Sequence, residues 1–316
     1  MKNILVTGVA GFIGSNLAKK LLAEGYRVVG LDNLSTGTLE NVPAGVEFHQ
    51  TDIRSRDLHP LFAGIDAVFH LAAKTNLPAC LKEPVDASDV NVTGTAMVLE
   101  ACRQAKLSKI IYADTSAEYE GVPDLPSRVD HIRPLSAYAV SKRGGALFCD
   151  VYQRFYGLDI TTVRYFNVYG PAQDWRRIFP PVVSSFTTQL LSGIQPTIYG
   201  TGEKRRDFIY VDDVNDLHLT ILRDDRTRGG IYNVGSGTNY SINKIFELID
   251  AELKTGLKPK YAAELPGEAE ATLADISNSL ALGWRPKVSI QEGLQRSINY
   301  YRERTSSKTG KKPNDS

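Results

Sequence analysis

The sequence is poor in cysteine, has no long apolar run and carries almost no net charge. Its three cysteines are an odd number at wide spacing, which indicates neither a disulfide framework nor a metal site such as zinc; they are Cys80, Cys102 and Cys149. No stretch of about 18 apolar residues occurs, so we expect no membrane span. The net charge of +1 gives no reason to expect a nucleic acid or a membrane surface as a partner.

The composition is that of an ordinary globular protein. Of the 316 residues, 42% are hydrophobic and 23% are charged, which excludes disorder as the main state. At roughly 150 residues per domain, the length indicates one large domain or two closely joined ones. The first apolar run starts at Ile4, which leaves no room for a signal peptide before it. We therefore expect a soluble cytoplasmic protein.

Short apolar runs alternate with segments of helical periodicity in the first half of the chain. The spacing of apolar residues predicts helices over 12–24, in the segment before Ser108, and over 137–155. The apolar runs predict strands near residues 4–7, 28–31, 46–48, 67–71, 109–113 and 160–164. Apolar strands separated by helices are typical of a parallel sheet covered on both faces. We therefore predict an α/β fold, a doubly wound parallel (Rossmann) sheet with ligands at the carboxyl ends of the strands.

The alternation becomes irregular after Asn167, where glycine and proline cluster. We expect a dinucleotide-binding domain over 1–166 and a smaller, mixed α/β substrate domain over 167–303, with a return to the first domain over about 208–235. The second domain should have helices near 178–192, 241–254 and 291–302. The end of the chain, 304–316, is polar and rich in lysine and serine, which predicts a disordered tail.

A glycine-rich turn lies between the first strand and the first helix. Gly8, Gly11 and Gly14 have the spacing GxxGxxG. The first glycine allows the turn, the second lets the backbone approach a pyrophosphate, and the third lets the helix pack closely on the strand. Amides at the N-terminus of the helix would then face the phosphates. The alternative is that the glycines serve only the packing of helix on sheet.

Carboxylates follow the next two strands. Asp32 ends the second strand, where it can accept hydrogen bonds from the adenosine ribose and would repel a 2′-phosphate. No arginine directly follows Asp32, so the sequence favours NAD over NADP. Asp52 and Ile53 follow the third strand, where they could hold the edge and face of the adenine. A turn-forming Asp52 is an equally good interpretation of this spacing.

Tyr138 and Lys142 lie four residues apart on a predicted helix, so both side chains can reach the same ligand. A phenol has an ordinary pKa of about 10, and a nearby lysine and a bound nicotinamide would both lower it. A lowered pKa suits removal of a proton from a sugar hydroxyl while hydride leaves the same carbon. Thr115 and Ser116 lie just past the fifth strand, where a hydroxyl could bridge the tyrosine and the substrate, or only cap the strand end.

These motifs resemble those of the extended short-chain dehydrogenase/reductases, in particular the NAD-dependent epimerases and dehydratases of nucleotide sugars. The resemblance covers about residues 1–303 and extends to further motifs: DNLSTG at 32–37, HLAA at 70–73, NVTGT at 91–95, YFNVYGP at 165–171, RDF at 206–208 and ADIS at 274–277. It implies NAD as cofactor, a UDP-sugar as substrate, and Thr115, Tyr138 and Lys142 as catalytic residues.

The resemblance also implies which residues contact the ligands. Cofactor contacts are expected from the glycine turn, the strand ends and the catalytic helix: Gly8, Gly11, Phe12, Ile13, Gly14, Asp32, Asn33, Ser35, Thr36, Gly37, Asp52, Ile53, Leu71, Ala72, Ala73, Lys74, Asn91, Tyr138, Lys142, Tyr165 and Val168. Substrate contacts are expected from the strand ends and the second domain: Asn76, Thr115, Ser116, Tyr138, Asn167, Val182, Tyr199, Arg206, Glu268 and Thr272. In similar enzymes the residues matching Asn167 and Arg206 hold the diphosphate, and the neighbouring cations Lys204 and Arg205 suit that role.

The residues after Thr115 bear on the type of reaction. Related 4,6-dehydratases carry Thr-Asp-Glu, whereas Ser116 and Ala117 follow here and cannot act as the acid and base that expel a 6-hydroxyl. A 4-epimerase needs only oxidation at C4, rotation of the 4-keto sugar and reduction from the other face. We therefore expect a 4-epimerase of UDP-glucose and UDP-galactose, with the N-acetylated pair as further substrates. A dehydratase or decarboxylase of nucleotide sugars and a non-catalytic NAD-binding regulator are the alternatives.

The chain departs from the family pattern at several positions. Asp114 stands where relatives have a small hydroxyl residue, and Glu118 stands where they have valine. The stretch after Gln173 and Asp174 lacks the arginine-rich pattern expected for a UDP-glucuronate 4-epimerase. At the position of Thr272, a tyrosine excludes N-acetyl groups in related 4-epimerases, whereas a small residue admits them.

An assembly is also implied by the resemblance. The helices near 86–105 and 137–155 carry apolar residues beyond one face. Relatives pair these helices into a four-helix bundle, so we expect a homodimer.

Overall fold

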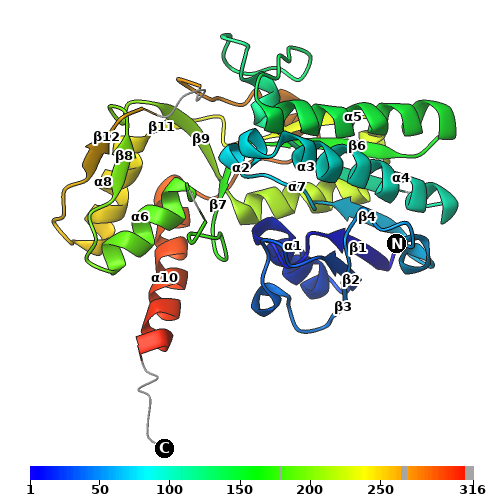
Figure 1. Ribbon diagram of the computed structural model, residues 1–316, viewed down its shortest axis with the longest axis horizontal. Helices are drawn as coiled ribbons and strands as arrows, with labels where there is room; N and C mark the ends of the chain where they lie inside the picture. Colours follow the sequence, from blue (N-terminus) through cyan, green and yellow to red (C-terminus); the bar gives the residue numbers. More distant parts are fainter. Residues whose placement is uncertain (108, 178, 265–268, 310–316) are drawn as a thin grey trace, which may run out of the picture.

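The computed structural model describes residues 1–107, 109–177, 179–264 and 269–309 (Figure 1). Its larger part is built on a seven-stranded sheet with the order β10-β6-β5-β4-β1-β2-β3, in which every neighbouring pair is parallel. The strands are β1 (Asn3–Thr7), β2 (Arg27–Asp32), β3 (Val46–Gln50), β4 (Ala67–His70), β5 (Lys109–Thr115), β6 (Ile160–Tyr165) and β10 (Ile231–Val234). The predicted doubly wound α/β fold is therefore confirmed.

Helices cover both faces of this sheet, because successive side chains of a strand point to opposite faces. Ile4 and Val6 of β1 belong to one buried core, and Leu5 between them belongs to the other. The first core lies under α1 (Phe12–Ala23) and α7 (Val211–Arg223), and the second lies under α4 (Gly94–Gln104) and α5 (Ala137–Tyr156). A sheet buried in this way leaves only its strand ends open to a ligand.

A helical stretch precedes β5, as expected from the apolar spacing before Ser108. It runs without a break through α3 (Pro84–Ser88), a π-helical turn (Asp89–Thr93) and α4, after the short helix α2 (Leu77–Lys82). Ser108 itself lies outside the described residues. The π-helical turn holds Asn91, and such turns are frequent at functional sites.

The smaller part lies beside the large sheet (Figure 1) and has a core of its own, in which Phe186, Phe246 and Leu294 bring three helices together. Its strands form a three-stranded sheet, β11-β9-β7, and a two-stranded sheet, β12-β8. The elements are β7 (Asn167–Tyr169), β8 (Thr197–Tyr199), β9 (Arg205–Tyr210), β11 (Asn239–Ser241), β12 (Lys260–Ala262), α6 (Val182–Leu191), α8 (Ile242–Leu253) and α10 (Ile290–Thr309).

The chain passes from one part to the other more than once. It leaves the large sheet after β6, and it returns through α7, which packs on α1, and β10, which pairs with β6. The short helix α9 (Ser277–Ala281) contacts β10. We propose the domain boundary at residues 166 and 167, with the return over 208–235, on this path.

Two helix boundaries differ from the prediction. The helix expected over 178–192 begins at Val182, because residues that precede proline avoid the helical region and Pro180 and Pro181 are consecutive; Ile178 lies outside the described residues. The last helix, expected over 291–302, begins at Ile290 and continues to Thr309. The tail predicted to be disordered is therefore helical over 304–309, and 310–316 lie outside the described residues.

Short helical turns complete the connections between these elements. The 3₁₀ turns are η1 (Leu39–Asn41), η2 (His59–Phe62), η4 (Ser116–Tyr119) and η5 (Asp225–Thr227). Among the described residues, no helix is both long and apolar enough to cross a membrane. The three cysteines are buried and free.

Candidate active site

A cleft of about 1040 Å³ opens at the carboxyl ends of the parallel strands. The ends of β1, β2, β4, β5 and β6 line it together with the loop after β7. Most of the predicted site residues meet there: Gly8, Gly11, Phe12, Ile13, Gly14, Asp32, Asn33, Ser35, Thr36, Asp52, Ile53, Leu71, Ala72, Ala73, Lys74, Asn76, Thr115, Ser116, Tyr138, Lys142, Tyr165, Asn167 and Val168. The cleft is at the edge where doubly wound sheets bind their ligands.

The glycine turn leaves no room for side chains. Gly8 has a φ of +74°, and a Cβ on it would lie 2.9 Å from the amide nitrogen of Ala72. A Cβ on Gly14 would lie 2.1 Å from the carbonyl oxygen of Gly8. Gly11 is the N-cap of α1 and provides no side-chain cap, so the first amides of the helix stay available to a phosphate. This backbone cradle fits the pyrophosphate of a dinucleotide.

Asp32 ties the glycine turn to the loop after β2. Its carboxylate accepts hydrogen bonds from the amides of Ala10 (3.0 Å) and Leu34 (2.8 Å). Burial raises the pKa of Asp32, and the two amide hydrogen bonds oppose that shift. The carboxylate still lines the cleft, where each oxygen keeps a lone pair for a ribose hydroxyl.

Arg54, which the sequence analysis did not single out, organises the adjoining wall of the cleft. It forms ion pairs with Asp52 (2.8 Å) and Asp86 (3.3 Å), and its hydrogen bond holds the pKa of Asp52 well below its ordinary value. Asp86 also pairs with Lys74 (2.5 Å), which in turn pairs with Glu83 (2.6 Å). Asp52 thus belongs to an ion-pair network at the cleft wall, and the ammonium of Lys74 is already compensated.

The predicted catalytic residues converge from β5 and α5. Thr115 ends β5, and Ser136 caps α5 by accepting a hydrogen bond from the Ala139 amide (3.1 Å), which puts Tyr138 in the first turn. Burial raises the pKa of Tyr138 above its ordinary value, while a hydrogen bond with Thr115 and the charge of Arg177 oppose that shift. The lowered pKa expected for Tyr138 is therefore not found, because burial outweighs the effects that oppose it.

Lys142 lies one helical turn after Tyr138 and is 3% exposed. Its ammonium sits over the ring of Tyr112, with 4.3 Å between the nitrogen and the ring centroid, and it makes no hydrogen bond or ion pair with the described residues. Burial lowers the pKa of Lys142, and the charge of Asp114 opposes that shift. A buried ammonium with unused donors fits a ligand rich in hydroxyl groups, such as a ribose.

Two residues predicted to contact the cofactor do not line the cleft. Asn91 uses its side-chain amide to bridge the backbone of Lys74 (2.8 and 3.0 Å) and the hydroxyl of Ser141 (2.9 Å). It therefore joins the cleft wall to α5, and its buried side chain does not face the cleft. Gly37 packs on Ala10, and a Cβ on Gly37 would lie 2.7 Å from the Ala10 carbonyl carbon. Asn91 and Gly37 therefore contact residues that line the cleft but do not line it themselves.

Several residues predicted to contact the substrate also lie outside the cleft lining: Val182, Tyr199, Arg206 and Thr272. Thr272 lies next to it, with its hydroxyl 3.5 Å from the Oδ1 of Asn167. Val182 packs on the core of the smaller part, and the ring of Tyr199 lies 5.9 Å from that of Phe179. Arg206 donates to the carbonyl of Arg205 (3.0 Å). Glu268 lies outside the described residues.

The loop after β7 adds two arginines to the cleft that the sequence analysis missed. Arg176 and Arg177 both line it. Arg176 donates to Asp174 (2.8 Å), whereas Arg177 makes no hydrogen bond or ion pair with the described residues. Two adjacent arginines in the sequence could have indicated a binding site, but only the fold brings them into the same cleft as Tyr138.

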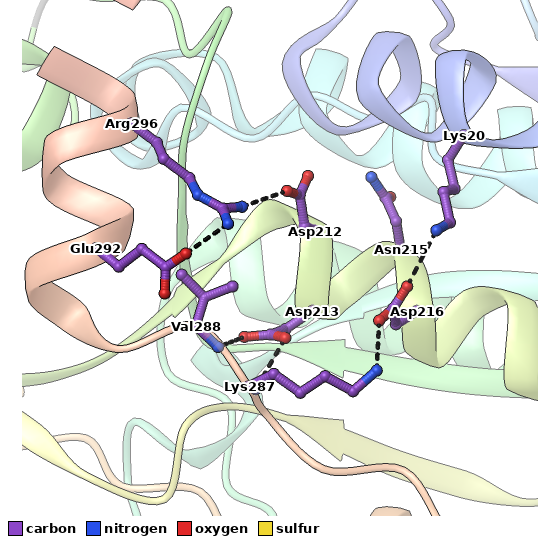
Figure 2. A pocket seen from close by; sticks show the side chains of 9 residues that line it. All are labelled: Lys20, Asp212, Asp213, Asn215, Asp216, Lys287, Val288, Glu292 and Arg296. Carbon is purple, nitrogen blue, oxygen red and sulfur yellow. Dashed lines mark hydrogen bonds and ion pairs between the residues drawn. The ribbon is translucent and has the colours of Figure 1, made fainter. Parts of the chain in front are cut away.

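A second hollow, of about 420 Å³, lies where α1, α7 and α10 meet (Figure 2). Figure 2 shows ion pairs across it: Arg296 with Asp212 (3.1 Å), Lys20 with Asp216 (3.4 Å) and Lys287 with Asp216 (3.0 Å). These pairs connect the two parts of the molecule, and none of the predicted site residues lies there. We assign it a role in packing.

The seven-stranded sheet, the glycine cradle and the cleft at the strand ends together define a dinucleotide-binding protein of the Rossmann class. The profile of the NAD dependent epimerase/dehydratase family matches residues 4–235. The chain belongs to this family, and NAD is its cofactor.

Relatives of known name are similar over nearly the whole chain. A putative UDP-glucose 4-epimerase of Methanocaldococcus jannaschii is 37% identical over 301 residues, which cover 94% of this chain and 97% of that protein. A UDP-glucuronate 4-epimerase of Thermodesulfobacterium geofontis is 36% identical over 316 residues, which cover 95% and 96%. The crystal structure of a UDP-glucose 4-epimerase of Thermotoga maritima with UDP-glucose has a TM-score of 0.93 at 34% identity, and covers 96% of this chain and 99% of that one.

Proposed function

We propose that this protein is an NAD-dependent 4-epimerase of UDP-hexoses that acts through a transient 4-keto sugar. The observation that carries the proposal is the meeting of Thr115, Tyr138 and Lys142 in the cleft that also holds the glycine cradle. This set can move a proton at one sugar oxygen next to a bound dinucleotide. A regulator that only senses NAD has no need of all three residues.

The three residues have different roles in the proposed reaction. NAD, when bound, supplies the reversible oxidation of C4. Tyr138 takes the proton of the 4-hydroxyl, and the Thr115 hydroxyl connects the phenol to the sugar oxygen. Lys142 holds the cofactor ribose and adds positive charge near the phenolate. After the 4-keto sugar has turned over in the cleft, C4 would be reduced from its opposite face, and Tyr138 returns the proton to the oxygen at C4.

The surroundings of Thr115 favour epimerisation over dehydration. Expulsion of a 6-hydroxyl needs an acid and a base beside the sugar. The acidic residues nearest to Thr115 are Asp114 and Glu118, and both pair with Arg164, at 3.1 and 2.7 Å, with fully buried side chains. Neither carboxylate is free to serve a substrate in the cleft.

We propose that the remaining substrate contacts come from the smaller part. Asn167 lines the cleft and lies 3.5 Å from the hydroxyl of Thr272, so Thr272 is close enough to shape the wall on that side. A threonine there leaves room for a C2 substituent, which supports turnover of the N-acetylated UDP-sugars as well. The predicted roles of Val182, Tyr199, Arg206 and Glu268 stay predictions.

We also propose a homodimer. Along α5, the apolar side chains of Leu147, Val151 and Phe155 are exposed by 49%, 41% and 70%, and Val85 of the adjacent α3 is exposed by 82%. α5 and α3 are in contact, so these exposed side chains lie on two neighbouring helices. Exposed apolar side chains on two neighbouring helices are typical of a helix-bundle interface.

Incubation of the purified protein with a panel of UDP-sugars tests the proposed reaction. We expect interconversion of UDP-glucose and UDP-galactose, followed by NMR, without net change of NAD. A 4-keto-6-deoxy product would instead identify a dehydratase, and a pentose product a decarboxylase. Binding of NAD without turnover of any UDP-sugar would favour the non-catalytic alternative.

A further inference from the structure

The ammonium of Lys142 lies against an aromatic ring rather than a carboxylate. Its nitrogen is 4.3 Å from the centroid of the Tyr112 ring, and the residue is 3% exposed. No hydrogen bond or ion pair joins this nitrogen to another described residue. Lys74, the other lysine that lines the cleft, is paired with Glu83 and Asp86. Of these two ammonium groups, that of Lys142 keeps its N–H donors for a ligand.

Tyr112 contacts Lys142 at both ends of that residue. The ring of Tyr112 lies against the ammonium, and its hydroxyl donates a hydrogen bond to the backbone carbonyl of Lys142 at 3.0 Å. The next turn of α5 comes close to this hydroxyl because it has a glycine there: a Cβ on Gly145 would lie 2.5 Å from the hydroxyl oxygen. The helix that carries the lysine therefore also fixes the position of the ring.

The ring of Tyr112 is also held from the side of β4. Its centroid lies 5.9 Å from that of His70, which is hydrogen-bonded to the hydroxyls of Thr7 (2.8 Å) and Thr95 (3.0 Å). All four of these side chains are buried. Burial lowers the pKa of His70 to about 3, and the charge of Lys142 adds to that shift. His70 therefore stays neutral and does not repel the ammonium.

We propose that Tyr112 is a positioning residue for the reaction, and that its ring holds the ammonium of Lys142 at the cleft without neutralising it. The inference rests on the proposed function, from which the role of Lys142 is taken. The face of an aromatic ring attracts a buried cation, and it carries no net charge that would cancel that of the lysine.

A carboxylate close to Lys142 shows why the ring is needed. Asp114 lies two residues after Tyr112 on the same face of β5, and its charge favours the charged form of Lys142. Without the ring, the ammonium would be drawn toward this buried carboxylate and away from the ligand. The ring thus keeps the donors of Lys142 available for the cofactor ribose.

Exchange of bound NAD for labelled NAD in the purified protein tests this role without any need for turnover. Tyr112→Leu should speed the exchange by about 10- to 100-fold, as for loss of one hydrogen bond to a charged group, and should also lower kcat. Tyr112→Phe keeps the ring and should stay within about threefold of the natural protein. Phe62→Leu is the matched control, because Phe62 is a wholly buried aromatic residue of the same core, and it should leave the exchange unchanged.

A double-mutant cycle separates positioning from packing. If Tyr112 acts through Lys142, Tyr112→Leu should change the exchange by less than about twofold in a protein that already carries Lys142→Met. Equal effects of Tyr112→Leu in both backgrounds would overturn the proposal. An exchange as fast in Tyr112→Phe as in Tyr112→Leu would also overturn it, because the ring would then not matter.

NMR of the natural protein with labelled lysine covers the case in which Tyr112→Leu does not fold. The ε-methylene signal of Lys142, identified by its loss in Lys142→Met, should be displaced upfield by the ring of Tyr112. A signal at the ordinary lysine position would overturn the proposal.

The outcomes separate this role from the proposed reaction. Absence of turnover of every UDP-sugar, together with coupling of Tyr112 and Lys142 in the exchange of NAD, would remove the epimerase proposal and keep the placement of Lys142 by Tyr112. Turnover of UDP-glucose with no effect of Tyr112→Leu on the exchange would overturn the positioning role alone.

Discussion

Arg164 donates a hydrogen bond from its Nε to Asp114 at 3.1 Å, directly behind the strand end that carries Thr115. The same guanidinium pairs with Glu118 at 2.7 Å and donates to the Tyr119 hydroxyl at 3.0 Å. All of these side chains are buried. One arginine thus pairs with two carboxylates, and it joins β6 to both ends of the turn that follows Thr115.

Removal of Arg164 should destabilise the fold strongly. Arg164→Met leaves the buried carboxylates of Asp114 and Glu118 without their cation, which costs about 3–5 kcal/mol for a buried pair. The free energy of unfolding in urea measures the loss. Addition of Asp114→Ser and Glu118→Val to this variant should recover most of it, because the buried charge is then gone. A loss below about 1 kcal/mol in Arg164→Met alone would contradict the prediction.

Stability should depend on the protonation of Glu118. Burial raises the pKa of Glu118 from 4.5 to about 7, and the charge of Asp114 adds to that shift. The folded protein therefore binds a proton that the unfolded chain releases, and this contribution to stability is lost as the pH rises from 4.5 to about 7.

Glu118→Gln removes this dependence. The natural protein should lose stability as the pH rises from 5 to 8, and the variant should not. The difference in unfolding free energy between the two should therefore shift by about 1–3 kcal/mol in favour of the variant over this range. Thermal unfolding at the two pH values measures it, with Glu252→Gln on the exposed surface of α8 as the control. The same pH dependence in the natural protein and in Glu118→Gln would show that another group titrates.

Tyr138→Phe should abolish turnover and spare the cofactor. Phenylalanine keeps the ring and lacks the hydroxyl, so the expected loss of kcat is at least about 10²–10⁴-fold. NAD released on denaturation should be the same as for the natural protein, since a cofactor recycled in place stays bound. Tyr156→Phe, at the exposed end of the same helix, is the matched control. Activity of Tyr138→Phe within tenfold of the natural protein would remove Tyr138 from the mechanism.

Thr272→Tyr should narrow the range of sugars. A tyrosine beside Asn167 would fill the space for a C2 substituent, so turnover of the N-acetylated UDP-sugars should fall by about tenfold or more while UDP-galactose is largely retained. The two substrates serve as controls for one another in a single preparation. An equal effect on both, or no turnover of UDP-N-acetylglucosamine by the natural protein, would refute this role of Thr272.

A charge on the exposed face of α5 should separate the proposed dimer. Leu147→Glu places a carboxylate in an apolar interface, where it would be buried without a partner. Light scattering at micromolar concentration should give twice the mass of one chain for the natural protein and the mass of one chain for the variant. Leu280→Glu, an equally exposed leucine on α9, should remain a dimer. If the natural protein has the mass of one chain, the proposed homodimer is refuted.

The sequence by itself determined the parts of this protein that depend on local spacing. Apolar periodicity distinguishes strands from helices over a few residues. The glycine spacing indicates where two backbone segments pack closely, as at Gly8 and Gly14. Tyr138 and Lys142 share a helix face whatever surrounds them. The glycine cradle could therefore be predicted, and the fold brings it into one cleft with the proposed catalytic residues.

Only the tertiary structure decided the roles that depend on contacts between distant segments. Asn91 matches a family motif, yet its amide is used up by Lys74 and Ser141, so it supports the cleft instead of lining it. Whether Asp114 is a free acid or half of an ion pair depends on Arg164, fifty residues away in the sequence. The charge state of a buried group is set by burial and by its neighbours in space, and neither is encoded in local residue spacing.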